Sequence, residues 1–185
     1  MWNLSQKALA QALKELLNTK NLDNITVKDI SSYCGLSRQT FYYHFSDVFD
    51  LVRWIFSTEA LDELGDSNTF DTWQQGFLKV FAYCKNNKVL VLNAYHSVNR
   101  KSLEDFLYSQ CFSLLMDVVD EEAIGMHVSH KHKVFIADFY KYAFVGMLEQ
   151  WLDDGMEQDA MQIITQISIL IEGDVKKALQ KFESK

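Results

Sequence analysis

The chain contains no proline in 185 residues and only seven glycines. β-rich folds normally use both residues to turn between strands, and they also use proline to protect sheet edges. A β-rich chain of this length would therefore lack its ordinary turn residues. The sequence predicts an all-α protein.

The composition is that of a globular protein. Apolar residues make up 48% of the chain and aromatic residues 14%, which excludes a disordered chain. The length fits one large domain or a small domain beside a larger one. The start of the chain lacks a cationic stretch followed by an apolar core, and no window offers about 18 uninterrupted apolar residues. We therefore expect a protein that is neither secreted nor membrane-spanning.

The three cysteines indicate a reducing compartment. Cys34, Cys84 and Cys111 are odd in number, far apart and never in a C-x-x-C pair. This usage argues against a disulfide framework or a structural zinc site. We expect reduced thiols in a cytoplasmic protein.

The charge is distributed unevenly along the chain. The formal net charge is -7, but residues 1–57 hold six Lys or Arg against five Asp or Glu, and the remainder holds twelve against twenty. Residues 1–57 therefore carry a net charge of +1 and the remainder a net charge of -8. This N-terminal excess of positive charge is weaker than that of most nucleic-acid-binding domains. Charge alone would not suggest DNA.

Apolar residues recur at helical spacing along almost the whole chain. The pattern predicts about nine helices, over 4–17, 26–33, 38–45, 47–65, 70–85, 89–98, 103–119, 134–152 and 160–182. Residues 66–71 are the only stretch that resembles a linker, and composition and charge shift across it. We expect a boundary between residues 50 and 65, dividing the chain into domains 1–57 and 58–185.

The most informative stretch is Thr26 to Phe45. Thr26 with Asp29 forms a pattern like a capping box, which starts a helix. Gly35 can adopt the left-handed conformation that ends this helix, and Ser37 is a good N-cap for the next one. Two short helices joined by a glycine-containing turn predict a helix-turn-helix.

The second of these helices has one apolar face. On a helical wheel Phe41 and Phe45 fall together and should be buried, which leaves Gln39 and Tyr43 on the opposite side. Arg38 lies nearer the buried side, so it must reach outward from the first turn through its long side chain. Arg and Gln can contact guanine and adenine edges in the major groove. The alternative is that these are ordinary surface residues of a helical domain.

This stretch resembles the TetR-type family of bacterial regulators. The run RQTFYYHF, residues 38–45, follows T-V-K-D-I and C-G-L-S and precedes D-x-x-D-L. The resemblance covers about residues 4–56. It implies a three-helix DNA-binding head on a larger helical body that dimerises through its last two helices and often holds a small-molecule pocket.

The resemblance also implies roles for single residues. Arg38, Gln39 and Tyr43 would contact bases. Hydroxyl and basic groups suit phosphate oxygens, which set the register without reading sequence. The expected phosphate contacts are Thr26, Lys28, Thr40, Tyr42 and His44. The family commonly has a lysine shortly after this run, but here Asp47 and Val48 occupy these positions. A phosphate contact would then be missing, which predicts modest affinity for DNA.

A finer resemblance is to the subgroup that activates dihydroxyacetone kinase operons. It is carried by the double tyrosine of RQTFYYHF, by Trp54-Ile55-Phe56 and by YAFVGMLEQWLDDGM at residues 142–156. In that subgroup the signal is implied to arrive through a partner protein, a relative of a kinase subunit that carries the sugar.

The body offers candidates for a pocket and an interface. Its aromatic residues either line a ligand cavity or fill a core, and sequence leaves both open; the pocket candidates are Phe81, Tyr95, Phe112 and Tyr140. The last two predicted helices are more apolar than a one-sided helix requires, so they either meet a second copy or pack internally. The candidate interface residues are Phe144, Leu148, Trp151, Ile164, Ile167, Ile171 and Val175.

The sequence gives little indication of a metal site or of catalytic activity. His127, His130 and His132 lie close together, but no cysteine or carboxylate joins them at a convincing distance, and a solvated helix start explains them. No motif of a hydrolase, phosphate-binding loop or metalloprotease is present. We expect no cofactor and no enzymatic activity.

The sequence thus predicts a homodimeric regulator that binds a palindromic operator in double-stranded DNA. A small-molecule effector or a partner protein would control it through the body. The alternative is a co-activator that depends on protein–protein interaction through that body and reaches DNA with its help.

Overall fold

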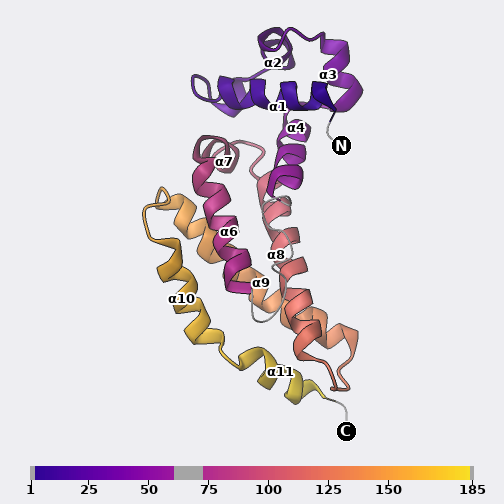
Figure 1. The fold of residues 1–185 in the computed structure, drawn as a ribbon, viewed down its shortest axis with the longest axis vertical. Coiled ribbons are helices and arrows are strands. Elements are labelled where there is room, and N and C mark those ends of the chain that lie inside the picture. Colours follow the sequence, from indigo (N-terminus) through magenta and orange to yellow (C-terminus); the bar gives the residue numbers. More distant parts are fainter. Residues whose placement is uncertain (1–2, 61–72, 184–185) are drawn as a thin grey trace. The chain divides into compact units, whose positions relative to one another are not determined.

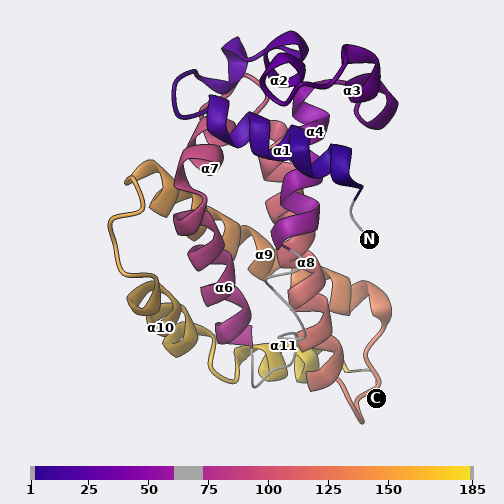
Figure 2. The ribbon, with the colours of Figure 1, turned by 45° about the horizontal axis from the view of Figure 1, so that its top comes forward.

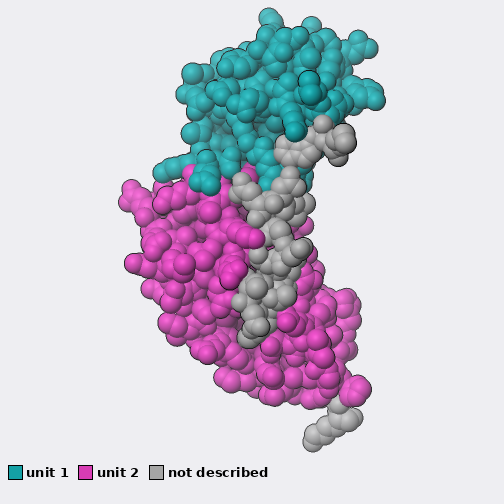
Figure 3. Space-filling view, in the orientation of Figure 1, with its two compact units in different colours: residues 1–62, 86–106 teal, residues 63–85, 107–185 magenta. Residues whose placement is uncertain are grey.

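The computed structural model describes residues 3–60 and 73–183. Every secondary-structure element within these ranges is helical, which confirms the all-α prediction. The chain divides into two compact units (Figure 3): unit 1 comprises residues 1–62 and 86–106, and unit 2 comprises residues 63–85 and 107–185.

Unit 1 contains the predicted helix-turn-helix. In both ribbon views α2 and α3 lie on the same side of α1 (Figures 1 and 2). The elements are α1 (Leu4–Leu16), the 3₁₀ turn η1 (Leu22–Asn24), α2 (Val27–Tyr33), α3 (Arg38–His44), α4 (Val48–Ile55), the π-helical turn η2 (Phe56–Ala60), α7 (Lys88–Tyr95) and the first residues of α8 (Lys101–Glu122). The predicted fourth helix continues past residue 60 into residues that lie outside the described ranges.

The core of unit 1 joins the first four helices. Leu9 and Leu13 of α1, Ile30 of α2, Phe41 of α3 and Leu51 of α4 are all fully buried. Burial of such apolar side chains is the main favourable contribution to folding. Because each of the four helices supplies at least one of these side chains, none of them packs independently of the others.

Residues 86–106 belong to unit 1 through polar contacts to the turn between α1 and α2. The Ser97 hydroxyl donates to one carboxylate oxygen of Asp23 at 2.5 Å, and the backbone N–H of Val98 donates to the other at 3.2 Å. The backbone N–H of Leu22 donates to the side-chain oxygen of Asn93 at 3.2 Å. A division at residue 57 does not anticipate this segment, and the predicted domain boundary stays a prediction.

Unit 2 is a bundle with an aromatic core. It contains α6 (Trp73–Asn86), the remainder of α8, α9 (His130–Asp153), α10 (Ala160–Ile171) and α11 (Asp174–Phe182). Phe77 of α6 stacks on Phe144 of α9 with ring centroids 4.2 Å apart, and Phe81 packs against Trp151 at 4.8 Å. The Trp151 indole N–H donates to the carbonyl of Gln158 at 2.8 Å, so this ring is buried with its polar atom satisfied.

The last predicted helix is two helices. The periodicity over residues 160–182 predicts one continuous helix, but α10 ends at Ile171 and α11 begins at Asp174. Gly173 lies between them with φ at 71°, a left-handed conformation that a helix does not continue through. Both ribbon views show the change of direction at this point (Figures 1 and 2).

No helix among the described residues is long and apolar enough to cross a membrane.

Candidate DNA-binding site

The turn before α3 is held by local hydrogen bonds. Gly35 has φ at 70°, and the N–H of Leu36 donates to the carbonyl of Ser31 at 2.9 Å. The Ser37 hydroxyl then accepts from the N–H of Thr40 at 3.0 Å, which satisfies a donor at the start of the helix. These bonds start α3 at Arg38.

One face of α3 is buried and the other is open to solvent. Phe41 is 0% exposed and Phe45 is 3% exposed, whereas Tyr43 is 83% exposed and Tyr42 is 59% exposed. Gln39 is also exposed, as the helical wheel predicts. The two phenylalanine rings, 5.8 Å apart, anchor the helix so that the tyrosines project outward.

The residues expected to contact bases share this open face. Arg38 is exposed in the first turn of α3 although the wheel places it nearer the core. Together with Gln39 and Tyr43 it supplies a guanidinium, an amide and a phenol on one short helix. These groups offer the donors and acceptors that base edges in a major groove require. Their contacts to DNA stay predictions.

The residues expected to contact phosphate differ in whether their polar groups already make hydrogen bonds within the protein. Lys28 is exposed on α2, and His44 is half-buried with its ring edge-on to Tyr43. The Thr40 hydroxyl is shared with Ser37 at 2.9 Å. The Thr26 hydroxyl donates to Asp29 at 2.7 Å, so its proton is already engaged within the protein. Thr26 therefore serves first as the N-cap of α2.

The same capping box controls the ionisation of Asp29. Its carboxylate accepts from the side chain and the backbone N–H of Thr26 and also pairs with Lys20 at 3.2 Å. The hydrogen bonds from Thr26, side chain first, and the contact with Lys20 lower the pKa of Asp29 from 3.8 to about 2. Hydrogen bonds to the charged form favour that form.

A pH titration tests this capping box. Because the pKa of Asp29 is lower in the folded state, its contribution to stability is present above pH 4 and is lost as the pH falls towards 2. We expect the carboxyl ¹³C resonance of Asp29 to titrate near pH 2 in the folded protein. In Thr26→Ala the midpoint should rise from there towards 3.8 without reaching it, because the hydroxyl bond, the largest contribution, is lost while the backbone N–H and Lys20 remain. An unchanged midpoint in that variant would show that Thr26 does not lower the pKa of Asp29.

The predicted pocket residues do not come together. Phe81 packs against Trp151 in unit 2, whereas Tyr95 lies in unit 1 under the Arg100 guanidinium at 3.9 Å. Phe112 lies 5.3 Å from the ammonium of Lys141. Of the four candidates, Tyr140 alone is among the described residues that line a cavity of unit 2 at the junction of α10 and α11. The predicted pocket as a set of four residues therefore stays a prediction.

Most of the predicted interface residues are buried within unit 2 itself. Ile167 and Ile171 are partly exposed; the buried ones are Phe144, Leu148, Trp151, Ile164 and Val175. The exposed apolar side chains of α9 and α10 are Phe135, Phe139, Tyr142, Met147, Met161, Ile169 and Leu170. The apolar surface of these helices is therefore formed mainly by these residues, with Ile167 and Ile171 partly exposed beside them, and the dimer interface stays a prediction.

The remaining sequence candidates have structural partners. His132 stacks on Phe182 with ring centroids 4.5 Å apart, and the N–H of His127 donates to Glu183 at 3.3 Å. The described residues contain no group of three or more His, Cys, Asp or Glu that could hold a metal. Burial raises the pKa of the Cys84 and Cys111 thiols to about 12, so both are neutral.

The polar residues of the cavity in unit 2 were not predicted from the sequence. Gln74, Ser168 and Glu172 line it beside Trp73 and Tyr140. The signal that could have found them was Gly173, a glycine inside an otherwise apolar helical pattern, which can mark a break.

Comparisons with known proteins cover nearly the whole chain. A family model described as "Transcriptional regulator C-terminal region" matches residues 71–173, and one described as "Bacterial regulatory proteins, tetR family" matches residues 9–53. The HTH-type dhaKLM operon transcriptional activator DhaS of Lactococcus lactis subsp. lactis (strain IL1403) is 26% identical over 175 residues, which are 94% of this chain and 91% of that protein.

Two solved structures share the fold. That of the dihydroxyacetone kinase operon activator DhaS has a TM-score of 0.71 at 26% identity and covers 98% of this chain and 99% of its own. That of NalD, the secondary repressor of the MexAB-OprM multidrug efflux pump in Pseudomonas aeruginosa, has a TM-score of 0.62 at 12% identity and covers 98% and 97%. The second likeness concerns the fold alone.

Proposed function

The chain belongs to the TetR family of bacterial transcriptional regulators, and from that premise we propose that it binds a palindromic operator as a homodimer. It is a transcriptional regulator and not an enzyme. In this proposal α3 of each protomer enters a major groove. Arg38, Gln39 and Tyr43 contact bases, and Lys28, Thr40, Tyr42 and His44 contact or brace the backbone. A regulator that binds DNA in this way would work in the bacterial cytoplasm.

The observation that carries this proposal is the polarity of α3. A helix of seven residues exposes two tyrosines, a glutamine and an arginine while two buried phenylalanines fix its position. Exposed aromatic side chains gain nothing by facing water, but they can contact bases and phosphates. The short α3 is thus a rigid support for a recognition surface.

Selection of binding sites from random double-stranded DNA tests the proposal. A dimer that inserts two recognition helices should select an inverted repeat whose half-sites lie about one helical turn, or a multiple of it, apart. Footprinting should protect both half-sites. A selected site without two-fold symmetry would contradict the dimeric arrangement.

Salt dependence gives a second prediction. Of the six basic residues in the head, Lys14, Lys20 and Arg53 are paired with carboxylates at 2.5 to 3.2 Å. If Lys28 neutralises one phosphate in each protomer, the slope of log K against log salt is about -2, since each phosphate contributes about -0.9. The measurement is operator binding by fluorescence anisotropy between about 50 and 200 mM salt, the range over which strongly basic regulators lose most affinity. A slope near about -10 would contradict this expectation.

The second copy is expected on the exposed apolar surface of α9 and α10. Phe135, Phe139 and Tyr142 of α9 are 61 to 65% exposed, and Ile169 and Leu170 of α10 are 71 and 75% exposed. Large apolar side chains that gather on exposed helix faces mark an interaction site more often than free surface. Dimerisation there would fix the separation of the two heads, and both must fit the duplex at once. A ligand or partner that changes this separation would release or engage the operator.

A partner-dependent activator is the second candidate. The observation that favours it is similarity to a protein named as an operon activator along nearly the whole of both chains. Following that resemblance, the partner would be a protein related to dihydroxyacetone kinase subunits. Operator affinity of the purified protein should then rise when that partner is added. Tight, sequence-specific binding that the partner leaves unchanged would favour the stand-alone regulator.

A further inference from the structure

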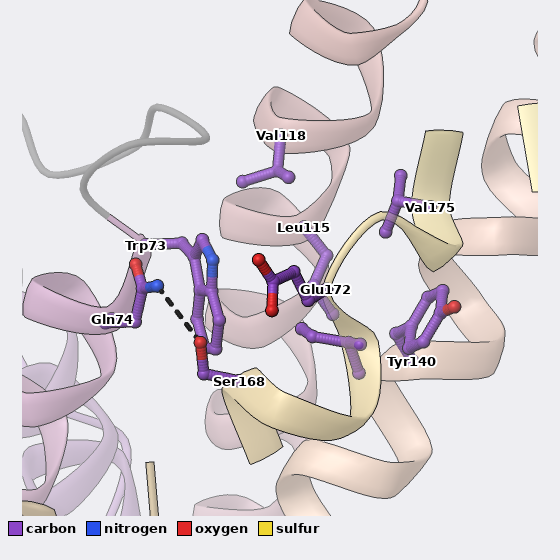
Figure 4. A pocket seen from close by; sticks show the side chains of 9 residues that line it. Trp73, Gln74, Leu115, Val118, Tyr140, Ser168, Glu172 and Val175 are labelled. Carbon is purple, nitrogen blue, oxygen red and sulfur yellow. Dashed lines mark hydrogen bonds between the residues drawn. The ribbon is translucent and has the colours of Figure 1, made fainter. Parts of the chain in front are cut away.

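We propose that the cavity at the junction of α10 and α11 binds a small organic cation. The cavity lies within unit 2 and has a volume of about 220 Å³. Its lining comes from the start of α6, from α8, from α9 and from the residues on either side of the helix break at Gly173. Figure 4 shows these side chains converging on one space.

The walls of the cavity are apolar and aromatic. Leu115 and Val118 of α8 and Val175 of α11 are buried and form an aliphatic surface. Trp73 is also buried, and its indole packs edge-on to Phe144 with centroids 5.5 Å apart. Because its neighbours fix this ring, it presents a preformed aromatic surface to a ligand. Aromatic faces attract cations through their quadrupole.

Of the described residues that line the cavity, only Glu172 is charged. In Figure 4 its carboxylate points into the cavity towards the Trp73 indole. Among the residues that the structure describes, no side chain or backbone N–H donates a hydrogen bond to this carboxylate. Its negative charge is therefore available to a ligand.

The surroundings favour positive over negative ligands. Burial, and secondarily the nearby carboxylate of Asp174, raise the pKa of Tyr140, so this phenol stays neutral and adds no negative charge of its own. Asp174 is itself paired with Lys177 at 3.1 Å. Within the described part of the chain, no lysine, arginine or histidine lines the cavity. An anion would meet the carboxylate of Glu172 without a compensating cation, whereas an ammonium group meets a carboxylate and an aromatic wall together.

The volume of the cavity and the polar groups at its rim restrict the class of ligand further. Pockets for drug-sized molecules occupy about 300 to 1,000 Å³, and this cavity is smaller. Gln74 and Ser168, which are joined by a hydrogen bond of 3.3 Å, provide oxygen atoms on the rim beside Trp73 (Figure 4). The cavity therefore fits a compact amine or quaternary ammonium compound that also carries a hydroxyl group.

Such a ligand would act on the helix break. Glu172 directly precedes Gly173, and Val175 is in the first turn of α11, so the ligand would contact both sides of the junction. The regulatory consequence, a changed orientation of α10 at the dimer surface, rests on the proposed function. The binding itself does not, and it can be measured without DNA.

Titration with choline tests the site directly. We would label the four tryptophans with ¹⁵N and assign the Trp73 indole resonance through Trp73→Phe. Choline should shift this resonance saturably. Its neutral isostere 3,3-dimethyl-1-butanol should bind about three- to tenfold more weakly, because the attraction at a partly exposed site is modest.

Two charge variants complete the experiment. Glu172→Gln should weaken choline binding by about the same three- to tenfold, whereas Glu157→Gln removes an equal charge elsewhere in unit 2 and should leave the affinity unchanged. Both residues are exposed, so the spectra of both variants should show an intact fold. Equal affinity for choline and the neutral alcohol, equal affinity in Glu172→Gln, or no shift of the Trp73 resonance would each overturn the proposal. None of these results depends on whether the protein binds an operator.

Discussion

Replacing Tyr43 with alanine is expected to weaken operator binding by about 30-fold or more without unfolding the protein. Tyr43 is 83% exposed, and its ring lies edge-on to His44 at 4.8 Å. Truncation therefore removes little packing. A specific base contact contributes about 1 to 3 kcal/mol, and a homodimer loses it twice, so about 2 to 6 kcal/mol is at stake.

The measurement is operator affinity by fluorescence anisotropy, with thermal unfolding as the check on folding. Tyr33→Ala is the matched control, because Tyr33 is also an exposed tyrosine of unit 1 but lies on α2, outside the predicted contacts. Tyr43→Phe separates the two parts of the side chain: retained affinity would assign the contact to the ring, and lost affinity to the hydroxyl. Unchanged binding in Tyr43→Ala would refute the predicted orientation of α3.

The head could be predicted from sequence because its signals are local. Thr26 and Asp29 lie three residues apart, Ser37 caps the helix it precedes, and Gly35 adopts the conformation for which glycine is suited. Each of these features depends on a few neighbouring residues. The spacing of Phe41 and Phe45 then predicts which face is buried, and the structure buries both.

The body was less predictable because its decisive contacts are distant in sequence. A single glycine is often tolerated inside a helix, so Gly173 did not by itself divide the last predicted helix. Phe81 and Tyr95 carry the same apolar signal, yet they lie in different units. Periodicity cannot distinguish an aromatic side chain that fills a core from one that lines a cavity.

The hydrophobic pattern of α9 does not separate its buried face from its exposed face, and the predicted interface residues stay a prediction. Phe144 packs against Phe77 of α6 and Leu148 is buried, whereas Phe135 and Phe139, on the same helix, are exposed. All four contribute equally to the hydrophobic pattern along α9. Only the packing of the other helices decides which of them remain for a second copy.

Phe41→Ala should have the largest effect on stability. The ring is fully buried and lies 5.8 Å from Phe45 and 5.7 Å from Tyr42. Removing a buried phenylalanine ring costs about 3 to 5 kcal/mol, which is a large part of the roughly 5 to 15 kcal/mol that stabilises a typical domain. We therefore expect unit 1 to be partly unfolded at about 37 °C and operator binding to be lost with it.

Hydrogen exchange can separate this loss from a direct loss of DNA contacts. The amides of Phe41 and Phe45, which donate within α3 to the carbonyls of Ser37 and Phe41, should exchange much faster in Phe41→Ala. They should keep their protection in Tyr43→Ala, since that variant leaves the buried face intact. Phe41→Leu keeps most of the apolar volume and should restore much of the protection. Protected amides together with retained operator binding in Phe41→Ala would mean that the phenylalanine does not position the recognition face, because α3 would then stay folded and correctly placed without its anchor.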